Sequence, residues 1–453
     1  MNNIHGIILA AGKGSRMHSS KPKVLHKIAH LTLLEHVLAQ AKQTCEHIHV
    51  VYGHGAEQVK KSLDDDKLNW VLQKQQLGTG HAVEQAMPDI DDQSISVILY
   101  GDVPLIQKQT LAKLIDESVK TGFALITVKL DNPSGYGRII RNAENQITAI
   151  VEHKDANEEQ LKVSEVNTGI MAINTALLKK YLSQLDSNNS QGELYLTDTI
   201  EMAVSDGVDV SSVEAENEFE VAGVNDKKQL AELERIMQKN MADKMMAEGL
   251  TIKDPNRFDC RGELSFGQDC EVDINVIIEG EVTLGNEVSI GPNCYIKNST
   301  IGEGVQILPN SVIEGAFIDD GATIGPFARV RPEAKIGKGA KIGNFVEVKK
   351  STIGAGSKVS HLSYVGDTTM GDNVNIGAGV ITCNYDGVNK HQTEIGDDVF
   401  VGSDTQLIAP VNVGDGANIG AGSTITKDVP ENQLTLSRAK QTTLKNWKRP
   451  VKK

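Results

Sequence analysis

The chain carries near its start a stretch that reads Ile7-Ile8-Leu9-Ala10-Ala11-Gly12-Lys13-Gly14-Ser15-Arg16-Met17, followed by Lys21-Pro22-Lys23. Residues 7–10 show no polar alternation, which predicts a strand buried on both faces, as in a parallel sheet. The two glycines allow a tight turn and a close approach of the backbone to a ligand. Such a turn directs several N–H groups at one point, which suits a phosphate. Arg16 and Lys23 add positive charge there, so the stretch predicts a phosphate-binding loop.

Spacing excludes two familiar phosphate loops. No Gly-Lys-Ser/Thr follows as in a Walker A loop, and Met17 stands where a dinucleotide fingerprint has its third glycine. The glycines alone also fit an ordinary strand-to-helix turn. The whole string, L-A-A-G-x-G-x-R-M followed by K-P-K, resembles the signature of the sugar nucleotidyltransferase family, whose members join a nucleoside triphosphate to a sugar 1-phosphate.

Composition limits the classes of protein to consider. The 453 residues suffice for two or three domains, and 42 glycines with only 4% aromatic residues indicate a repeat built from short turns. A net charge of −14 argues against general binding of nucleic acids or membranes. Five scattered cysteines indicate reduced thiols in a cytoplasmic protein. We expect no signal peptide, and no apolar run approaches the roughly 20 residues of a membrane span.

The first part of the chain, residues 1–226, alternates strand-like and helix-like segments. Strands are expected at 48–52, 96–100 and 123–128, and helices at 33–41 and 111–119. This alternation predicts a Rossmann-like α/β domain with a mostly parallel sheet. Ligands then bind beyond the carboxyl ends of the strands, where the glycine-rich stretch lies.

Several polar motifs of this domain have a plain and a functional interpretation. Asp102, at the end of a predicted strand, is either a turn former or a metal ligand. Gln73 and residues 77–82 form either a polar loop with an N-cap at Thr79 or a contact to a nucleotide base.

The family resemblance favours the functional interpretation. It implies Mg²⁺ on Asp102 and Asn225, and catalytic contacts to the phosphates from Arg16 and Lys23. The residues that it implies for binding UTP or the UDP-sugar are Leu9, Ala10, Ala11, Gly12, Lys23, Gln73, Gly78, Thr79, Tyr100, Gly101, Asp102, Gly137, Glu152, Asn167 and Asn225.

A single helix is expected to link two domains, over residues 227–249. Asp226 is a suitable N-cap and Gly249 a suitable stop. The apolar residues that keep helical spacing in between are Leu230, Leu233, Met237, Met241 and Met245.

From about Val272, in a domain that spans 250–453, aliphatic anchors recur every six residues. They include Ile324, Val330, Ile336, Ile342, Val348, Ile395, Val401, Leu407, Val413, Ile419 and Ile425. Small or β-branched residues stand four positions after an anchor, as at Ala328, Ala334, Ala340, Thr405, Ala417 and Ser423. This hexapeptide repeat predicts a parallel β-helix with three faces and roughly 18 residues per turn. Resemblance to known hexapeptide folds implies a left-handed coil, against the usual crossover rule.

Departures from the period mark candidate functional positions. Residues 382–391 contain no anchor and are expected to leave the coil as a loop. His361, Arg331 and Lys349 follow anchors at positions that point outward, where stacked coils can build a phosphate-binding wall. A solvated surface histidine is the plain alternative for His361.

Taken whole, the chain resembles the family of bacterial bifunctional N-acetylglucosamine-1-phosphate uridylyltransferase/glucosamine-1-phosphate N-acetyltransferases. The strings S-H-L-S-Y-V-G-D, N-I-G-A-G and C-N-Y-D-G of the repeat carry this resemblance, together with the order of the domains. It implies synthesis of UDP-N-acetylglucosamine, a precursor of peptidoglycan and lipopolysaccharide, from UTP, acetyl-CoA and glucosamine 1-phosphate through N-acetylglucosamine 1-phosphate.

The same resemblance assigns roles in the repeat domain. It implies that His361 is the catalytic base, within a cytoplasmic homotrimer whose sites are shared between chains. Glucosamine 1-phosphate would bind to Arg331, Lys349, Tyr364 and Asn375. Acetyl-CoA would bind to Ala378, Asn384, Tyr385, Ser403, Ala421 and Arg438.

Three alternatives make distinguishable predictions. A single-function nucleotidyltransferase with an oligomerising β-helix, as in ADP-glucose pyrophosphorylases, would lack His361 and the loop at 384–385. A non-catalytic subunit, like some translation-factor subunits, would have lost the glycine loop or Asp102. A γ-carbonic anhydrase needs three zinc-binding histidines, and the repeat has two, His361 and His391. The sequence therefore favours two enzymes in one chain.

Overall fold

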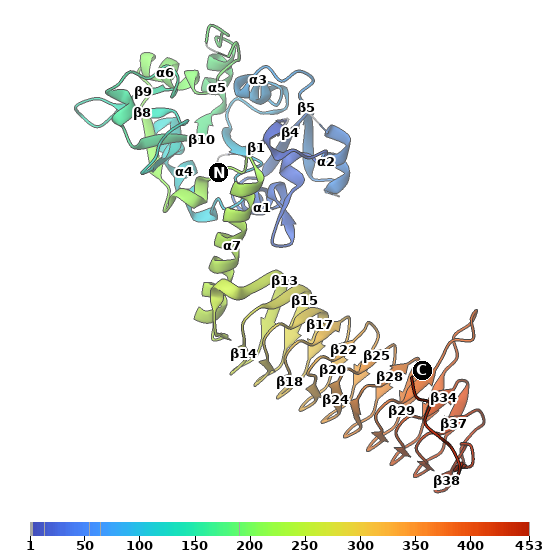
Figure 1. Cartoon of the computed structure of the whole chain (residues 1–453). Coiled ribbons are helices and arrows are strands. Elements are labelled where there is room, and N and C mark those ends of the chain that lie inside the picture. Colours follow the sequence, from blue (N-terminus) through green and yellow to red (C-terminus); the bar gives the residue numbers. More distant parts are fainter. Residues whose placement is uncertain (1–2, 13, 54, 64, 190, 453) are drawn as a thin grey trace. The chain divides into compact units, whose positions relative to one another are not determined.

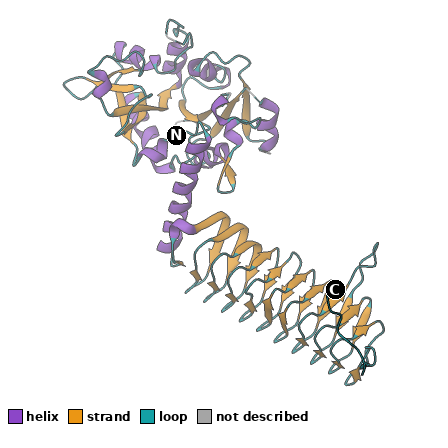
Figure 2. Cartoon of the chain, viewed as in Figure 1, coloured by secondary structure: helices purple, strands orange, loops and turns teal. Residues whose placement is uncertain are grey.

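The computed structural model describes residues 3–12, 14–53, 55–63, 65–189 and 191–452, so Lys13 of the glycine-rich stretch lies outside the described residues. The chain divides into two compact units, Met1–Met237 and Gln238–Lys453. Helix α7 (Lys227–Ala247) crosses this division (Figure 1). Figure 2 shows helices and strands mixed in the first unit, whereas the coils of the second unit are built from strands.

The first unit is built on one mixed sheet with the strand order β11-β7-β10-β6-β1-β4-β5. Its strands are β1 (Ile4–Ala10), β4 (His47–Tyr52), β5 (Leu68–Leu72), β6 (Ile95–Tyr100), β7 (Phe123–Lys129), β10 (Glu165–Asn174) and β11 (Val210–Glu214). Strands β6, β1, β4 and β5 are parallel, and β10 alone runs antiparallel to β6 and β7. The predicted α/β domain with a mostly parallel sheet is therefore confirmed.

A small hairpin of β8 (Arg138–Arg141) and β9 (Ile147–Val151) joins the sheet through β10. A second hairpin, β2 (Lys27–Ile28) and β3 (Leu31–Thr32), leads into the first helix. The helices are α1 (Leu33–Ala41), α2 (Ala56–Ser62), α3 (Thr79–Glu84), α4 (Lys108–Thr121), α5 (Thr175–Leu182) and α6 (Asp198–Ser205).

Strand β1 is buried on both faces, as the absence of polar alternation predicts. Ile8 packs on one side of the sheet with Leu34 of α1, whereas Ile7 packs on the other with Val83 of α3 and Leu178 of α5. Ile7 and Ile8 are fully buried. The turn that follows β1 is thus attached to the centre of the domain.

The linker helix forms where its sequence signals predict it. Asp226 accepts a hydrogen bond from the backbone N–H of Gln229 at 2.9 Å, as an N-cap residue does. Leu233 packs in the first unit, and Ala242 and Met245 pack in the second. Among the described residues, no helix combines the length and apolar character that crossing a bilayer requires.

The second unit is a parallel β-helix with three faces, as the repeat predicts. The first face consists of β12 (Thr251–Ile252), β14 (Glu271–Val272), β16 (Ser289–Ile290), β18 (Gln306–Ile307), β21 (Thr323–Ile324), β24 (Lys341–Asn344), β27 (Lys358–His361), β30 (Asn375–Ile376), β33 (Phe400–Val401), β36 (Asn418–Ile419) and β38 (Leu434–Thr435).

The other two faces form one continuous sheet, because the long strands of the first coils run through both. The long strands are β13 (Phe258–Phe266), β15 (Val276–Leu284) and β17 (Tyr295–Ile301). The second face continues with β19 (Val312–Glu314), β22 (Arg329–Val330), β25 (Glu347–Lys349), β28 (Tyr364–Gly366), β31 (Ile381–Cys383), β34 (Gln406–Ile408) and β37 (Thr424–Ile425). The third continues with β20 (Phe317–Ile318), β23 (Lys335–Ile336), β26 (Thr352–Ile353), β29 (Thr368–Met370), β32 (Thr393–Ile395) and β35 (Val411–Val413).

The six-residue anchors line the interior of this β-helix. Ile324 stacks on Ile342, and Ile342 on Val359, and all three are fully buried. The coil begins earlier than the sequence period indicates, because β12 and β13 precede Val272. This first coil is closed by Phe258 and Cys260, which do not match the aliphatic anchors of the later repeats.

The corner between the first and second faces of the β-helix has left-handed backbone in successive coils. Here the corner residues Asn310, Phe327, Phe345 and Leu362 have φ angles of 62°, 54°, 56° and 48°. Successive corners are joined by backbone hydrogen bonds, such as Phe345 N–H to Phe327 O at 3.1 Å. Asparagine tolerates this conformation, whereas bulky side chains adopt it rarely.

The predicted loop leaves the coil between β31 and β32. It is closed by an antiparallel bridge between Tyr385 and Lys390 and by a 2.7 Å contact from His391 to Asp386. His391, together with the backbone N–H groups of Asn389 and Val388, holds the pKa of the Asp386 carboxyl well below its ordinary value. The loop is therefore tied together by its own side chains.

A buried histidine pair joins β1 to β4. Nδ1 of His5 lies 3.0 Å from Nε2 of His49, and the two residues are 5% and 1% exposed. One ring nitrogen donates and the other accepts, so at least the accepting ring is neutral. Burial lowers the pKa of His49 to about 4, with smaller contributions from His5 and His47, and burial also lowers the pKa of His5.

We predict that protonation of His49 lowers the unfolding free energy of the chain as the pH falls. Its folded pKa lies below its unfolded value, so its contribution is complete above about pH 6.5 and declines as the pH falls toward 4. The decline amounts to about 3 kcal/mol at pH 4, at about 1.4 kcal/mol per pKa unit. His49→Gln should flatten the fall of the unfolding free energy between pH 7.5 and 4.5. Urea unfolding followed by tryptophan fluorescence measures this.

The control for that experiment is His18→Gln, which removes an exposed histidine of the same unit. The control should keep the wild-type pH dependence. An equally steep fall in His49→Gln would show that the buried pair does not titrate during unfolding.

Candidate active sites

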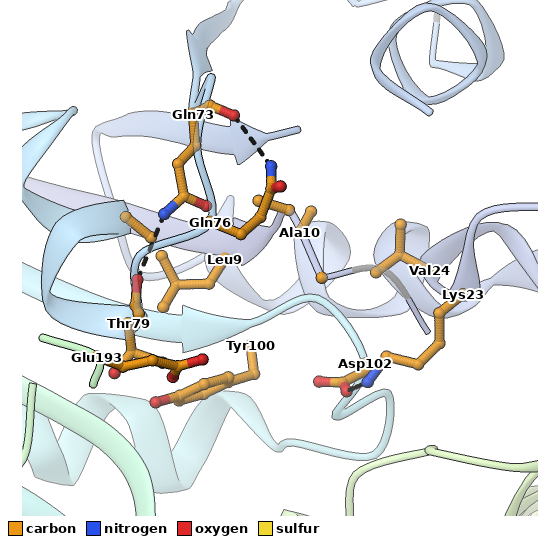
Figure 3. A pocket seen from close by; sticks show the side chains of 14 residues that line it. Leu9, Ala10, Lys23, Val24, Gln73, Gln76, Thr79, Tyr100, Asp102 and Glu193 are labelled. Atoms are coloured by element: carbon orange, nitrogen blue, oxygen red, sulfur yellow. Dashed lines mark hydrogen bonds and ion pairs between the residues drawn. The ribbon is translucent and has the colours of Figure 1, made fainter. Parts of the chain in front are cut away.

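An opening in the first unit lies at the carboxyl ends of β1 and β6 and at the start of α3 (Figure 3). It has a volume of about 220 Å³. Its lining consists of Leu9, Ala10, Ala11, Gly12, Lys23, Val24, Gln73, Gln76, Gly78, Thr79, Ala82, Tyr100, Asp102 and Glu193. Ten of these residues were expected from the sequence at a nucleotide site, so the structure brings them together in one cavity.

The two glycines of the turn after β1, Gly12 and Gly14, have different surroundings. At Gly14 φ is 59°, and an added Cβ would lie 2.7 Å from the Cβ of Lys23, so this position requires glycine. At Gly12 an added Cβ would meet no atom within 4 Å. Gly12 therefore leaves room in the cavity for a ligand to approach the backbone.

Lys23 and Asp102 contact each other at one side of the cavity (Figure 3). The Lys23 ammonium forms an ion pair with the Asp102 carboxylate and lies 3.2 Å from Oδ1 of Asn225. The backbone N–H of Val224 donates to Asp102 O at 2.9 Å, which holds Asn225 beside Asp102. Asp102 and Asn225 thus present two oxygen ligands to one point.

This donor set fits Mg²⁺. Carboxylate and amide oxygens are its preferred ligands, and it usually takes few protein ligands while keeping waters and substrate phosphates. Within the described residues, no group of three or more His, Cys, Asp and Glu side chains is arranged to hold a metal ion.

The segment that contains Gln73 and residues 77–82 forms the opposite wall. Gln73 is buried, and its Nε2 lies 3.3 Å from Gly78 O and 3.0 Å from Nδ1 of His81. Helix α3 begins at Thr79 with Gly78 at the cap position, so an N-cap at Thr79 is wrong. The Thr79 hydroxyl instead accepts a hydrogen bond from Leu196 N–H at 3.2 Å.

Residues 192–198 hold this wall in place. Leu194 N–H donates to Leu77 O, and Gly80 N–H donates to Leu194 O, at 2.8 and 2.9 Å. A Cβ at Gly78 would lie 2.5 Å from Leu194 O. Glu193 of this segment lines the cavity, as do Val24 and Gln76, which the sequence analysis did not select, and Ala82, the last residue of the expected segment 77–82.

The expected sugar-binding residues lie beside the cavity and form a connected group. Asn167 N–H donates to Gly137 O at 2.9 Å, and Asn167 Oδ1 accepts from Gly169 N–H at 3.0 Å. Gly169 has φ 82°, and a Cβ there would lie 2.7 Å from the Tyr100 ring, so both the backbone and the space require glycine. The Glu152 carboxylate lies close to Gly137, where an added Cβ would be 3.2 Å from its Oε1. The group therefore adjoins the cavity through Tyr100.

Burial and neighbouring carboxylates raise the pKa values of several acidic groups in this region. Burial raises the pKa of Glu152 and that of Tyr100, and for Tyr100 the charges of Asp102 and Glu152 add to the effect. Burial and the carboxylates of Asp186, Glu201, Glu152 and Asp155 raise the pKa of Asp198 to about 6. This side of the cavity therefore favours neutral polar groups over further negative charge.

Two expected residues have other positions. Gly101 is buried and donates its N–H to Leu9 O at 3.0 Å, so it connects β6 to β1. Arg16 lies in a short 3-10 helix, Ser15–Met17, and is exposed. Neither residue belongs to the lining, and Arg16 would need to turn toward a ligand.

In the second unit, one column of expected residues runs along the edge of the first face. The backbone ladder joins His361, Ala378, Ser403 and Ala421 in successive coils, through Gly379 N–H to His361 O, Asp404 N–H to Ala378 O and Gly422 N–H to Ser403 O. Arg438 donates to Ala421 O at 2.9 Å at the end of the column. His361 is exposed, and its Nδ1 lies 2.8 Å from Asn344 Oδ1.

A second group lies on the neighbouring face. Arg331 pairs with Glu347 at 2.7 Å, and Lys349 pairs with Asp367 at 3.1 Å. The Asn384 amide also donates to Asp367. The group thus concentrates cations and amides beside Tyr364, which opens β28 of the same face.

Lys390 joins this group, although the sequence analysis did not select it. Its contact with Lys349 lowers the pKa of Lys390, while the pKa of Lys349 is raised by that contact and by Asp367. Lys390 belongs to the loop outside the six-residue period, so no repeat position pointed to it.

The two groups lie on opposite sides of the left-handed corner. His361 ends β27 before the corner residue Leu362, and Tyr364 opens β28 after it. Asn375 is exposed on the face of His361, whereas Tyr385 is 60% exposed on the loop. Because the corner is convex, the groups point outward in different directions.

Comparisons with known proteins match the two folds. Residues 6–159 match a MobA-like NTP transferase domain, and residues 392–427 match the six-repeat bacterial transferase hexapeptide model. Residues 260–331 and 312–409 match the GMPPB C-terminal domain. A solved structure of a putative glucose-1-phosphate thymidylyltransferase from Bacillus anthracis covers 51% of this chain and 94% of its own, with 20% identity and a TM-score of 0.44, which is too low to bear on function.

Relatives match over the full length. The bifunctional protein GlmU of Ruthia magnifica subsp. Calyptogena magnifica is 64% identical over 453 residues, and that of Marinobacter nauticus is 55% identical over 453 residues. Each match covers all of this chain and all of the relative. The prediction of a nucleotidyltransferase and a hexapeptide acetyltransferase in one chain is confirmed, and the single-function alternative is set aside. The chain belongs to the GlmU family of bifunctional proteins.

Proposed function

We propose that the first unit transfers a uridylyl group from UTP to N-acetylglucosamine 1-phosphate. The observation that carries this proposal is the cavity in which Gly12, Lys23 and Asp102 meet at the carboxyl end of β1. Gln73 and Thr79 stand at the base side, and the group around Asn167 stands at the sugar side.

The reaction needs no protein nucleophile. An oxygen of the sugar phosphate attacks the α-phosphorus of UTP in line, and pyrophosphate leaves. Arg16 and Lys23 bind the phosphates. Asp102 and Asn225 would hold Mg²⁺, which would neutralise charge on the phosphates. Catalysis then consists of positioning and charge neutralisation.

Asp102→Ala should remove uridylyl transfer and leave acetyl transfer unchanged. Loss of one preorganised electrostatic contact costs about 10²–10³ in turnover, and loss of the metal ligand should cost at least that. Mass-resolved product assays of each half-reaction measure both activities in the same preparation.

The matched control is Asp209→Ala, which removes an exposed carboxylate of the same unit. It should leave both activities intact. Loss of both activities in a folded Asp102→Ala protein would contradict two separate sites, and retention of uridylyl transfer would remove Asp102 from the mechanism.

We infer that the second unit transfers an acetyl group from acetyl-CoA to the amine of glucosamine 1-phosphate. The amine must lose a proton to attack the thioester, and histidine is the side chain most suited to accept it near neutral pH. His361 has this role, and Asn344 fixes the orientation of its ring at 2.8 Å. Arg331, Lys349 and Lys390 bind the sugar phosphate, with Tyr364 and Asn375 at the sugar.

The cofactor lies along the column that starts at His361. Ala378, Ser403 and Ala421 place small side chains in successive coils, which leaves a path for acetyl-CoA along the edge of the face. Arg438 at the end of the column meets the cofactor phosphates, while Asn384 and Tyr385 complete the site from the loop.

His361→Ala should lower the kcat of acetyl transfer by about 10²–10⁴, the usual contribution of a general base. The KM for acetyl-CoA and the rate of uridylyl transfer should change little. Steady-state kinetics of both half-reactions measure this. A variant with near-normal acetyl-transfer turnover at pH 7 would leave substrate positioning, not His361, as the main source of rate.

We infer a homotrimer in which neighbouring chains complete each acetyl-transfer site. The residues for this reaction lie on both sides of a convex corner, so a single chain cannot close them around one substrate. The corner itself carries Phe327, Phe345 and Leu362, which are 50%, 56% and 62% exposed. The two phenylalanine rings stack with centroids 5.2 Å apart. Exposed apolar side chains on left-handed backbone cost about 1–3 kcal/mol each, which an interface between chains offsets.

Phe345→Asn should weaken the trimer without lowering the stability of the single chain, because asparagine suits the left-handed backbone, as at Asn310. Acetyl transfer should fall with dissociation, and uridylyl transfer should not. Light scattering across a dilution series measures the assembly. Phe317→Asn, on the third face, is the control with a similarly exposed ring. A wild-type monomer with full acetyl transfer would contradict the shared site.

The remaining inference is the cellular setting. UTP and acetyl-CoA are cytoplasmic metabolites, and we infer that the protein works in the cytoplasm on small molecules, supplying a precursor of peptidoglycan and lipopolysaccharide. The net charge of −14 repels nucleic acids and anionic lipid surfaces, which supports this setting.

A further inference from the structure

Lys23 stands at the point where the two oxygen ligands of the first unit meet. Its ammonium contacts both the Asp102 carboxylate and Oδ1 of Asn225, and the side chains of Lys23 and Asp102 are only 14% and 16% exposed. These are the atoms to which the proposed function assigns Mg²⁺. The lysine therefore occupies the position of the metal.

An ammonium and a divalent cation compete for these oxygens. Mg²⁺ binds oxygen at about 2.1 Å in a near-octahedral arrangement, and a second positive charge against the same carboxylate oxygen would repel it strongly at this degree of burial. Without any cation, however, the largely buried Asp102 carboxylate would be left unpaired, which is costly. Each cation can satisfy the site, but only one at a time.

We propose that Lys23 is a built-in counter-cation that fills the metal site of the substrate-free enzyme and gives it up when metal and triphosphate bind together. The proposal rests on the function proposed for this cavity. Lys23 lines the same cavity as Gly12, so a displaced ammonium stays within reach of the incoming phosphates. The lysine thus exchanges one anionic partner, the Asp102 carboxylate, for another.

The exchange has a thermodynamic consequence. As long as Lys23 holds the ligands, only a fraction of the protein is competent to bind metal, and the apparent affinity for metal is reduced by that fraction. A triphosphate that attracts the ammonium raises the competent fraction, so metal and nucleotide bind with positive coupling. The site then takes up its metal with the substrate and not before it.

The close packing at Gly14 ties the lysine to the phosphate loop. A Cβ at Gly14 would lie 2.7 Å from the Cβ of Lys23, so the loop backbone rests directly on the lysine stem. The stem is held while the long, unbranched end can reorient. With its stem fixed in this way, Lys23 can place its ammonium against either of two anions, the Asp102 carboxylate or a phosphate.

The experiment is a titration of the substrate-free, full-length protein with Mn²⁺, with free Mn²⁺ followed by electron paramagnetic resonance. Lys23→Met, and Lys23→Gln as a second neutral variant, should bind Mn²⁺ about tenfold or more tightly than the wild type, since the competing cation is gone. Lys23→Arg keeps the charge and should not show this gain. Lys21→Met removes the same charge from an exposed position two residues away and should change the affinity little. Asp102→Asn identifies which of the bound ions occupies this site.

Each outcome decides the matter. Neutral Lys23 variants that bind no more tightly than the wild type, while Asp102→Asn loses the ion, would overturn the exchange and leave the metal site of the proposed function standing. An equal gain in Lys21→Met would reduce the effect to general electrostatics and overturn it too. If neither the wild type nor any Lys23 variant bound an Asp102-dependent ion, the exchange and the proposed metal site would both be wrong.

Discussion

Burial of β1 on both faces is the constraint on which the first unit depends. Ile7 and Ile8 pack into separate clusters on the two sides of the sheet, and β1 lies between β6 and β4. The turn after β1 therefore starts from a fixed point, and Asp102, beyond the end of β6, is fixed relative to it. The strand fixes where the loop begins, and Gly14 lets the loop backbone pack on Lys23.

In the β-helix, the repeated backbone of the coils determines where side chains lie. Each coil repeats the backbone of the last, so a residue at one repeat position lies directly beside its counterparts in the coils above and below. His361, Ala378, Ser403 and Ala421 form such a column. The only large departure from the repeat in residues 250–452 as described here, the loop between β31 and β32, brings Asn384 to Asp367 and Lys390 to Lys349. The regular coils build the column of residues, and the loop between β31 and β32 adds contacts that the repeat does not provide.

The sequence predicted the periodic parts well because burial alone determines them. Strand β1, helix α1 and the anchors of the repeat follow from apolar spacing, which needs no knowledge of distant residues. The first coil escaped prediction, since Phe258 and Cys260 fill its interior without the aliphatic period. Glu193 and Gln76 also escaped, because they reach the cavity through contacts between distant segments, such as Leu194 with Leu77 and Gly80. The cation contact of Lys23 with Asn225 joins residues far apart in sequence and leaves no local pattern.

The central claim is that one chain carries out two successive group transfers on the same sugar. The most direct measurement supplies purified protein with glucosamine 1-phosphate, acetyl-CoA, UTP and Mg²⁺ and separates the products by mass. The account predicts UDP-N-acetylglucosamine together with free CoA and pyrophosphate, and N-acetylglucosamine 1-phosphate alone when UTP is omitted. Formation of a UDP-sugar without acetyl transfer, or acetyl transfer without any UDP-sugar, would contradict it.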